Sequence, residues 1–435
     1  KNSTEEAQYE VRHKGGSSRF SVNQTMGGGT WIYLGTFPFA KGSNNSKGVF
    51  LNNNSSSNKD VITADAVKFG GGMGNIARKP SDTDKEGNPV LPNFDVEPEI
   101  SGYPRYTEGS RYWLQWAGFN DTIYSVNRNF TDYNDDYQSR GMWVNILTDG
   151  SYLKPDRVGY NIPIDLSFAF HTDAGTTLTD SIIGTLAIYT RLSMDQDEYP
   201  YGVKRSIARD YNDIVQTQIV DDIRALFEPE WSRRGMWDKA YSESRSPEVP
   251  AMLLELLSHQ NLADMRYGLD PAFRFVVSRS IYKGMLKYLS WLKDTPYIVQ
   301  PLPVRAFSAE ITESGKKYQA QLKWEPRVDR LESTANTRSY MLYTRVDDGG
   351  FDNGVPVNGN SFSVNIEPGK IYSFKVTAVN EGGESFPSEI LSVGLADSRS
   401  TRVVAKGKTV LVVNNFDRVA APSSFATRDS TYGGF

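Results

Sequence analysis

The sequence lacks cysteine altogether, has only three histidines, and has no apolar run near the roughly 18 residues of a membrane-spanning helix. Because thiols are absent, disulfide bonds and thiolate metal ligands are excluded. Imidazole donors are limited to His13, His171 and His259. A strongly basic face is not expected either, because the net charge is −4. We therefore expect no nucleic-acid partner and no membrane-spanning segment.

The two ends of the sequence lack further features. The N-terminus opens on a polar run, KNSTEEAQYEVRHKGG, without the apolar core of a signal peptide. Near the other end, the strand-like segment Thr409–Val413 is followed only by a polar stretch that cannot form a domain by itself. We therefore expect both ends to lie inside a longer protein.

What the sequence does contain is enough material for several domains. At 435 residues, two to four compact units are expected. Residues 1–80 combine short β-type segments, such as Thr30–Phe39 and Val61–Phe69, with turns rich in Gly, Asn and Ser. Residues 81–101 are a polar linker. Alternating strand patterns return in residues 297–397, and residues 398–435 begin a further, truncated domain.

Residues 102–296 have a different pattern, in which helices alternate with apolar strands. Nearly continuous apolar runs are typical of strands that are covered on both faces. The pattern therefore predicts an α/β domain with a sheet flanked by helices. The expected helices are Arg105–Ala117, Ile207–Phe227 and Pro271–Leu292, and the expected strands are Ile164–Phe170, Ile183–Tyr189 and Val249–Leu257.

Two polar side chains interrupt these apolar runs and are candidates for chemistry. His171 follows the first run, at the carboxyl end of a strand, where the functional groups of α/β sheets gather. An imidazole there suits metal ligation or proton transfer, and a hydrogen-bonded loop histidine is the alternative. Glu255 lies inside the third run, where a carboxylate is costly unless it is paired, ligated or catalytic. A purely structural pair with Arg245 or Arg191 is the alternative for Glu255.

The segments around these two residues, AFHTDAG and VPAMLLELLSHQN, resemble the zinc-dependent N-acetylmuramoyl-L-alanine amidases. The second segment continues into LADMRYGLDPAFRFVVSRSIYKGML, which is similar to the closing helix of that family. The resemblance implies that His171 is a zinc ligand, that Glu255 is the catalytic acid/base and that Asn261 is the motif asparagine. Asp173, His259 and Arg191 are candidate accessory groups of the same site.

The sequence departs from the family pattern in its motif residues and in the number of zinc ligands that it offers. Ala169 and Asp173 replace the serine and asparagine of the first motif, and Leu257 and Ser258 replace the Gly-Phe of the second. Zinc needs about three protein ligands, and within residues 102–296 no other histidine precedes His171. Either the remaining ligands lie before residue 1, with the β unit inserted into the amidase domain, or the metal has been lost. We expect the first arrangement.

The first β unit contains a Trp-x-x-Leu-Gly-x-Phe pattern from Trp31 to Phe37 and the sequence Ala64-Asp65-Ala66-Val67-Lys68-Phe69. These patterns resemble the golvesin and xanthan-lyase carbohydrate-binding-like module, a β-sandwich whose opening strands are missing here. Trp31 is a candidate sugar contact, and a core position in an alternating strand is the alternative for it.

The second β unit contains Trp324 and the strand YSFKVTAVNEGG, which begins at Tyr372. This pattern resembles a fibronectin type III β-sandwich. The residues that carry this resemblance are structural, so it implies spacing or docking and no chemistry.

The order of these units resembles large exported proteins of Bacteroidetes-type bacteria that carry xanthan lyase or amidase labels. The resemblance implies a periplasmic or outer-surface protein that contacts peptidoglycan or another glycan, together with other cell-envelope proteins. If active, it hydrolyses the N-acetylmuramoyl-L-alanine amide with zinc as cofactor. The main alternative is a non-catalytic cell-surface scaffold that binds glycan or protein through a degenerate amidase fold. A polysaccharide lyase ranks last.

Overall fold

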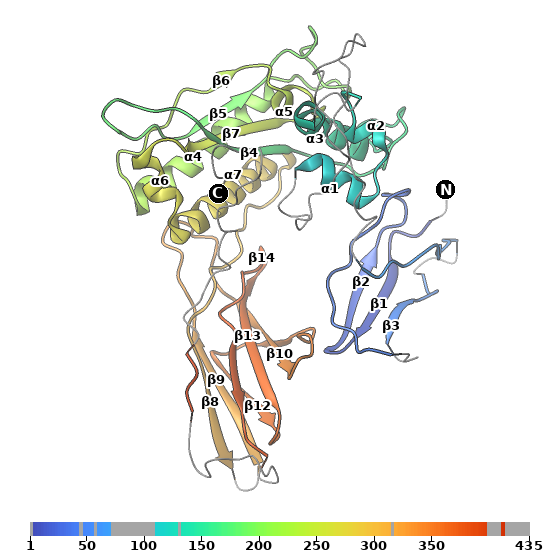
Figure 1. The fold of residues 1–435 in the computed structure, drawn as a ribbon, viewed down its shortest axis with the longest axis vertical. Helices are drawn as coiled ribbons and strands as arrows, with labels where there is room; N and C mark the ends of the chain where they lie inside the picture. The colour runs from blue at the N-terminus through green and yellow to red at the C-terminus, as the bar shows by residue number, and fades with distance from the viewer. Residues whose placement is uncertain are drawn as a thin grey trace, which may run out of the picture.

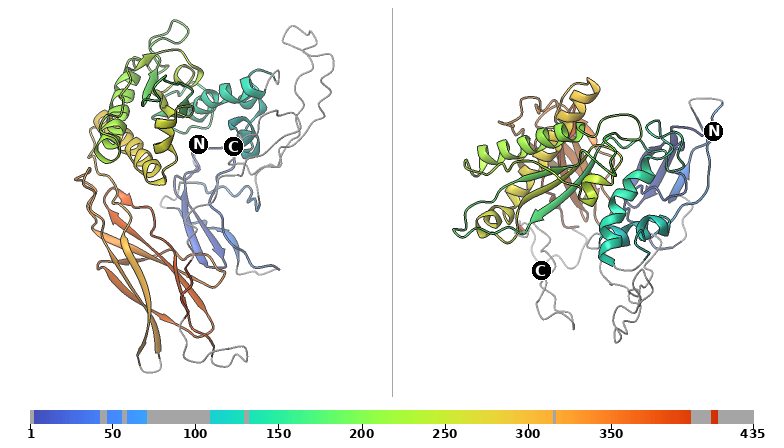
Figure 2. Two further views of the ribbon diagram at one scale, coloured as in Figure 1. Left: turned by 60° about the vertical axis from the view of Figure 1, so that its left-hand side comes forward. Right: turned by 90° about the horizontal axis from the view of Figure 1, so that it is seen from above.

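A computed structural model describes residues 3–42, 47–55, 59–70, 109–128, 132–314, 317–397 and 410–413. An α/β unit stands between two β units in the sequence, and in Figure 1 both β units lie below it, on the same side (Figures 1 and 2). The expected multidomain architecture is therefore confirmed. None of the helices in the described ranges is long and apolar enough to cross a membrane. The expected linker at 81–101 and most of 398–435 fall outside the described residues.

The N-terminal unit contains an antiparallel sheet in the order β2-β1-β3. Its strands are β1 (Ala7–His13), β2 (Gly16–Val22) and β3 (Gly48–Leu51). A two-residue turn joins β1 to β2, because His13 pairs with Gly16. The φ of Gly16 is +132°, a value that a residue with a side chain rarely adopts. Ala7, Val11 and His13 alternate on the buried face of β1.

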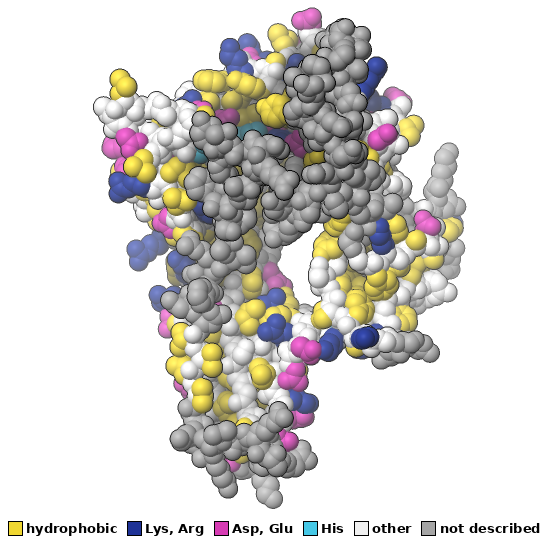
Figure 3. All heavy atoms as spheres, in the orientation of Figure 1, with side chains coloured by type: hydrophobic (Ala, Val, Ile, Leu, Met, Phe, Trp, Pro, Cys, Tyr) yellow, Lys and Arg dark blue, Asp and Glu magenta, His cyan; other side chains and the backbone are white. Residues whose placement is uncertain are grey.

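The strands expected at Thr30–Phe39 and Val61–Phe69 are wrong, because both segments have irregular backbone apart from one bridge between Ser3 and Val61. Aromatic and β-branched residues favour strands only where a neighbouring strand can pair with them. Trp31 is accordingly no core residue of a strand, since it is 43% exposed. Other large hydrophobic side chains of these segments are also exposed, and Figure 3 shows hydrophobic side chains gathered over this unit.

A small helical layer opens the α/β unit. It contains α1 (Ser110–Ala117), α2 (Asp121–Tyr124) and α3 (Asp132–Thr148). Leu114, Phe119 and Ile123 form its core. A fully buried ion pair joins α1 to α3, with Arg111 Nη1 lying 2.9 Å from Asp135 Oδ2. The first residues of the helix expected at Arg105–Ala117 lie outside the described residues.

The central sheet has the strand order β4-β7-β5-β6. Its strands are β4 (Ser167–Asp173), β5 (Leu186–Tyr189), β6 (Trp237–Asp238) and β7 (Ala251–Ser258). β4 runs parallel to β7, and β5 runs antiparallel to β7 and parallel to β6. All four residues of β5 and seven of the eight residues of β7 are buried. The runs at Ile183–Tyr189 and Val249–Leu257 therefore became interior strands, as the sequence predicts. The run at Ile164–Phe170 did not, because β4 is an edge strand of partly buried and exposed residues.

Two long helices, α4 (Ile207–Leu226) and α7 (Pro271–Lys293), cover one face of this sheet. The apolar face of α4 repeats at helical spacing through Tyr211, Val215, Ile219 and Ile223, all fully buried. Gly284 of α7 lies so close to α4 that a Cβ there would be 2.8 Å from the Val215 Cα. Two further short helices of the unit are α5 (Ser242–Arg245), which contacts β4, β5 and β7 on the opposite face, and α6 (Leu262–Gly268).

The C-terminal unit is a sandwich of two antiparallel sheets, as the fibronectin type III resemblance implies. Trp324, Leu342 and Phe374 lie in the core between them. One sheet contains β8 (Arg305–Ser314), β9 (Lys317–Glu325) and β12 (Ser361–Ile366). The other contains β10 (Ser339–Val346), β11 (Val355–Val357), β13 (Ile371–Asn380), β14 (Gly383–Glu384) and β15 (Leu391–Gly394).

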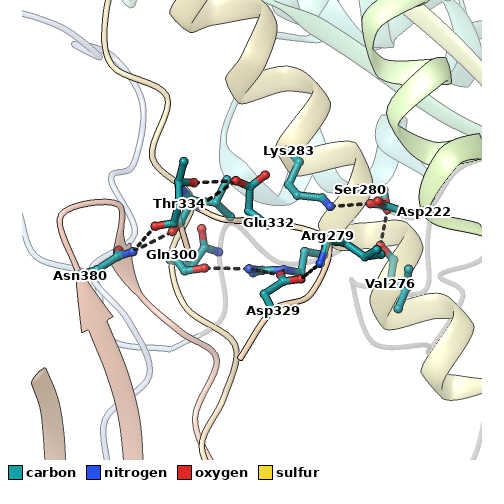
Figure 4. A network of polar contacts seen from close by, with 12 residues as sticks. Asp222, Val276, Arg279, Ser280, Lys283, Gln300, Asp329, Glu332, Thr334 and Asn380 are labelled. Carbon is teal, nitrogen blue, oxygen red and sulfur yellow. Dashed lines mark hydrogen bonds and ion pairs between the residues drawn. The ribbon is translucent and has the colours of Figure 1, made fainter. Parts of the chain in front are cut away.

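Polar contacts join α7 to the sandwich (Figure 4). Arg279 of α7 pairs with Asp329 at 2.9 Å and donates to the Gln300 carbonyl. Asn380, at the end of β13, donates to the carbonyl of Val299 in the connecting segment. The Arg279 and Asp329 side chains are 10% and 9% exposed, so this ion pair is well shielded from water.

Candidate active site

The candidate site lies in the carboxyl-terminal halves of the parallel strands β4 and β7. His171 of β4 and Glu255 of β7 are register partners, so their side chains project from the same face of the sheet. β4 extends to Asp173, so His171 lies inside the strand rather than just after it, where the apolar pattern had predicted it. The two polar interruptions of the apolar runs thus stand side by side, although 84 positions separate them in the sequence (255 − 171).

Glu255 has apolar neighbours on the side of β5. Leu186, Ile188 and Leu253 form a buried cluster on the same face of the sheet. Burial raises the pKa of the Glu255 carboxyl, because the charged form loses hydration. Its Oε2 atom is buried and has no hydrogen-bond partner in the described part of the chain. Neither Arg245 nor Arg191 pairs with it there, so the structural alternative for this glutamate does not apply to the described residues.

A chain of charges fixes His171. Its Nε2 lies 2.8 Å from Oε2 of Glu243 on α5, and Oε1 of Glu243 accepts from Arg140 on α3 at 2.6 Å. Arg140 in turn pairs with Asp136 at 2.7 Å. The hydrogen bond to Glu243 raises the pKa of His171. Burial acts to raise the pKa of Glu243, but hydrogen bonds from His171 and Arg140 outweigh it and lower that pKa.

Glu243 and Arg140 were not identified from the sequence. Neither residue belongs to a recognisable motif, and each lies far from His171 along the chain. Their contact depends on the packing of α3 against α5, where a Cβ at Gly141 would be 2.7 Å from Ser246. No local signal in the sequence could have found them.

Asp173 also borders the site. Its Oδ2 accepts from Nη1 of Arg234 at 2.6 Å, and its Oδ1 accepts from the Ala174 amide. Burial acts to raise the pKa of Asp173, but the hydrogen bond from Arg234 and those from the backbone lower it overall. Arg234 is a further residue that the sequence did not single out.

The other expected accessory residues do not contact His171 or Glu255 through any hydrogen bond of the described chain. His259 bonds through Nδ1 to the Thr172 hydroxyl. Asn261 is 2% exposed and caps α6 by accepting from the Asp264 amide, which is a structural role. Arg191 pairs with Asp238 beyond the end of β5. Trp31 belongs to the N-terminal unit, where its ring lies under the Lys68 ammonium group.

The described residues do not complete a zinc site. Catalytic zinc takes about three protein donors, and no group of three His, Asp or Glu side chains in the described ranges could hold a metal ion. The Nε2 of His171 is engaged by Glu243. The additional ligands expected before residue 1 therefore remain a prediction.

Comparisons with known proteins find matches to parts of this chain. Residues 1–71 match the family described as the Golvesin C-terminal domain. Among curated proteins, no sequence matches this chain. Solved structures match parts of it at low identity.

Three of these structures illustrate the range of the similarity. The twitchin kinase region from C. elegans is 21% identical over 22% of this chain and 17% of its own, with a TM-score of 0.19. The N-acetylmuramoyl-L-alanine amidase AmiC2 of Nostoc punctiforme is 15% identical over 29% of this chain and 58% of its own, with a TM-score of 0.23. The CwlD amidase from Clostridioides difficile is 14% identical over 37% of this chain and 64% of its own, with a TM-score of 0.27. This chain thus spans less than two thirds of the length of each of these proteins.

Proposed function

We propose that the α/β unit hydrolyses the amide between the muramoyl lactyl group and L-alanine in peptidoglycan, with Glu255 as the acid/base. One observation carries the proposal. Glu255 stands beside His171 on two paired parallel strands, and its Oε2 has no hydrogen-bond partner in the described part of the chain. A carboxylate kept free at such a position is available for a proton from solvent or substrate.

The surroundings of Glu255 suit proton transfer near neutral pH. Burial raises its pKa, which makes the carboxylate a better base and allows the acid form to persist closer to working pH. In the proposed reaction Glu255 takes a proton from the attacking water as oxygen bonds to the amide carbon. It then gives that proton to the departing alanine nitrogen as the C–N bond breaks. The products are a free lactyl carboxylate and an amine.

His171 has a separate task in this proposal. Its Nε2–H is held by Glu243, and the raised pKa favours the protonated ring. A positive imidazole beside Glu255 would help to stabilise the negative charge that develops on the carbonyl oxygen. If donors from a longer protein complete a zinc site, His171 is the residue of this chain that would join it, and zinc would then polarise the carbonyl.

Activity on muramoyl peptides tests the proposal. We expect new alanine amino groups to appear when the protein is incubated with peptidoglycan fragments, and Glu255→Gln to lower the rate by about 10²-fold or more. Glu230→Gln, at an exposed position after α4, is the matched control and should keep the rate. Equal rates for the Glu255 and Glu230 variants would refute the role of Glu255.

We further propose an exported protein of the cell envelope, with peptidoglycan or another glycan as its partner. The match of residues 1–71 to the Golvesin C-terminal domain supports a module of surface proteins in front of the α/β unit. Detection of the native protein in periplasmic or surface fractions, and its absence from the cytosol, is the expected result of fractionation.

A non-catalytic scaffold is the second candidate, and a specific observation favours it. Glu243 engages Nε2 of His171, and the described residues offer no three-donor metal group. A scaffold would bind peptidoglycan in a sedimentation assay without releasing amino groups, and it would bind equally well as Glu255→Gln. Hydrolysis that depends on Glu255 would exclude this candidate.

A further inference from the structure

The segment that leads into β6 places an arginine on the site face of the sheet. Arg233 bridges to Thr185 beside β5, and its side chain pairs with Asp213 of α4 on the opposite face. Arg234, the next residue, therefore projects toward the site. Trp237 pairs with Ile188 of β5 and so projects from that face as well.

Arg234 extends over the ends of the central strands. Its Nη1 reaches Asp173 on β4 at 2.6 Å, although its backbone donates to Thr185 next to β5. The pair with Asp173, two residues after His171 on β4, brings the guanidinium to the edge of the sheet that carries His171 and Glu255. The guanidinium carbon lies 5.6 Å from the centre of the Trp237 ring. Arg234 thus borders the same face as His171 and Glu255.

Its hydrogen-bonding capacity is only partly used. A guanidinium has five N–H donors in a planar fork that fits a carboxylate. Asp173 accepts from Nη1, and no other side-chain hydrogen bond of Arg234 occurs in the described part of the chain. The Arg234 side chain is 22% exposed, and the neighbouring Trp237 is 42% exposed. A charged donor and an aromatic face are therefore both open to a ligand at the rim of the site.

We propose that Arg234 and Trp237 form a subsite for a carboxylate of the substrate, carried by the peptide that follows the scissile amide. This inference rests on the function proposed above. The free donors of Arg234 would bind the carboxylate, while the Trp237 ring would pack against the adjoining apolar atoms of the peptide or sugar. The ion pair with Asp173 fixes the orientation of the Arg234 guanidinium. The subsite thereby selects acidic stem peptides over their amidated forms.

Two ligands that differ only in this group test the subsite. The probes are N-acetylmuramoyl-L-alanyl-D-glutamate γ-methylamide, which keeps one free carboxylate, and the same compound with that carboxylate converted to a carboxamide. Binding is measured by calorimetry on the full chain carrying Glu255→Gln, which prevents turnover. We expect the acid to bind about tenfold more tightly than the amide, as for one charge-assisted hydrogen bond.

In the Glu255→Gln background, Arg234→Ala should make the affinities for the two probes equal. Arg234→Lys keeps the positive charge but loses the planar set of donors, so it should keep part of the preference for the acid. Arg233→Ala is the matched control on the opposite face and should leave the tenfold ratio unchanged. A ratio that persists in Arg234→Ala, or a parent chain that binds both probes equally, would overturn the subsite alone. A chain that binds neither probe would overturn the proposed function together with the subsite.

Discussion

At the scale of single residues, Lys154 shows how a buried charge is stabilised by its partners. Lys154 is almost fully buried, and its ammonium group contacts Asp149 at 2.6 Å, Glu248 at 2.8 Å and the Asn145 carbonyl at 3.1 Å. Lys154→Met would leave Asp149 and Glu248 with only the half-exposed Arg157 as a shared cation, in place of the buried ammonium group. We expect the free energy of unfolding to fall by about 3 kcal/mol, measured by urea denaturation.

The exposed pair of Lys204 with Asp197 and Glu198 supplies the control for this change. Lys204→Met should alter the free energy of unfolding by less than about 1 kcal/mol, because solvent screens exposed ion pairs. Similar losses for the two variants would show that burial does not govern the effect.

The same cluster predicts a pH dependence. Burial acts to raise the pKa of Glu248, but hydrogen bonds from Lys154 and Arg157 outweigh it and hold the pKa below its usual 4.5. A carboxyl whose folded pKa is lowered stabilises the fold above its unfolded pKa, and this stability is lost as the pH falls through the folded pKa. Urea denaturation at pH 7 and at acidic pH should show a smaller acid-induced loss for Glu248→Gln than for the parent chain.

From the sequence alone, site residues could be identified only where they differ clearly from their neighbours along the chain. His171 and Glu255 could be singled out because each interrupts an apolar run, and the structure places them side by side. Glu243, Arg140 and Arg234 have no such signature. Their positions near the site arise from helix packing and from a side chain that crosses strand ends, and neither can be read from spacing along the chain.

At the scale of elements, segments with a strong period were predictable. The helix expected at Ile207–Phe227 is α4, which ends one residue earlier, and the helix expected at Pro271–Leu292 is α7, which ends one residue later. Both have long apolar faces that pack on the sheet. The strands expected at Thr30–Phe39 and Val61–Phe69 failed because a strand needs a partner, and composition does not reveal whether one is present.

The α4–α7 contact makes a prediction at this scale. A Cβ at Gly284 would lie 2.8 Å from the Val215 Cα, a backbone atom that cannot move aside easily. Gly284→Ala should therefore destabilise the protein by about 1–3 kcal/mol through overpacking, although alanine favours helices by about 1 kcal/mol over glycine. Thermal unfolding would measure the change, and Ser278→Ala on the exposed face of α7 should shift the midpoint little. A stabilised Gly284→Ala protein would contradict the close approach of the two helices.

At the scale of the whole molecule, the junction of α7 with the sandwich decides whether the two units behave as one. Asp329→Ala would leave the guanidinium of Arg279 shielded from water without its carboxylate. We expect the interaction free energy between α7 and the sandwich to weaken by about 3 kcal/mol. In calorimetry the unfolding of the sandwich and that of the α/β unit should then separate into two transitions.

The exposed pair of Arg305 and Glu325 within the sandwich provides a comparison. Arg305→Ala removes an ion pair of the same type at the surface, and the shape of the unfolding transition should stay as in the parent chain. Unchanged cooperativity in Asp329→Ala would mean that other contacts couple the units.

The junction also has a mechanical consequence. The segment between α7 and β8 is held from both sides, because Arg279 binds the Gln300 carbonyl and Asn380 binds the Val299 carbonyl. A force that pulls on the sandwich therefore passes into a 23-residue helix packed on the central sheet, instead of stretching a free connector. These hydrogen bonds must break together before the two units separate, so we expect the junction to resist bending when force is applied.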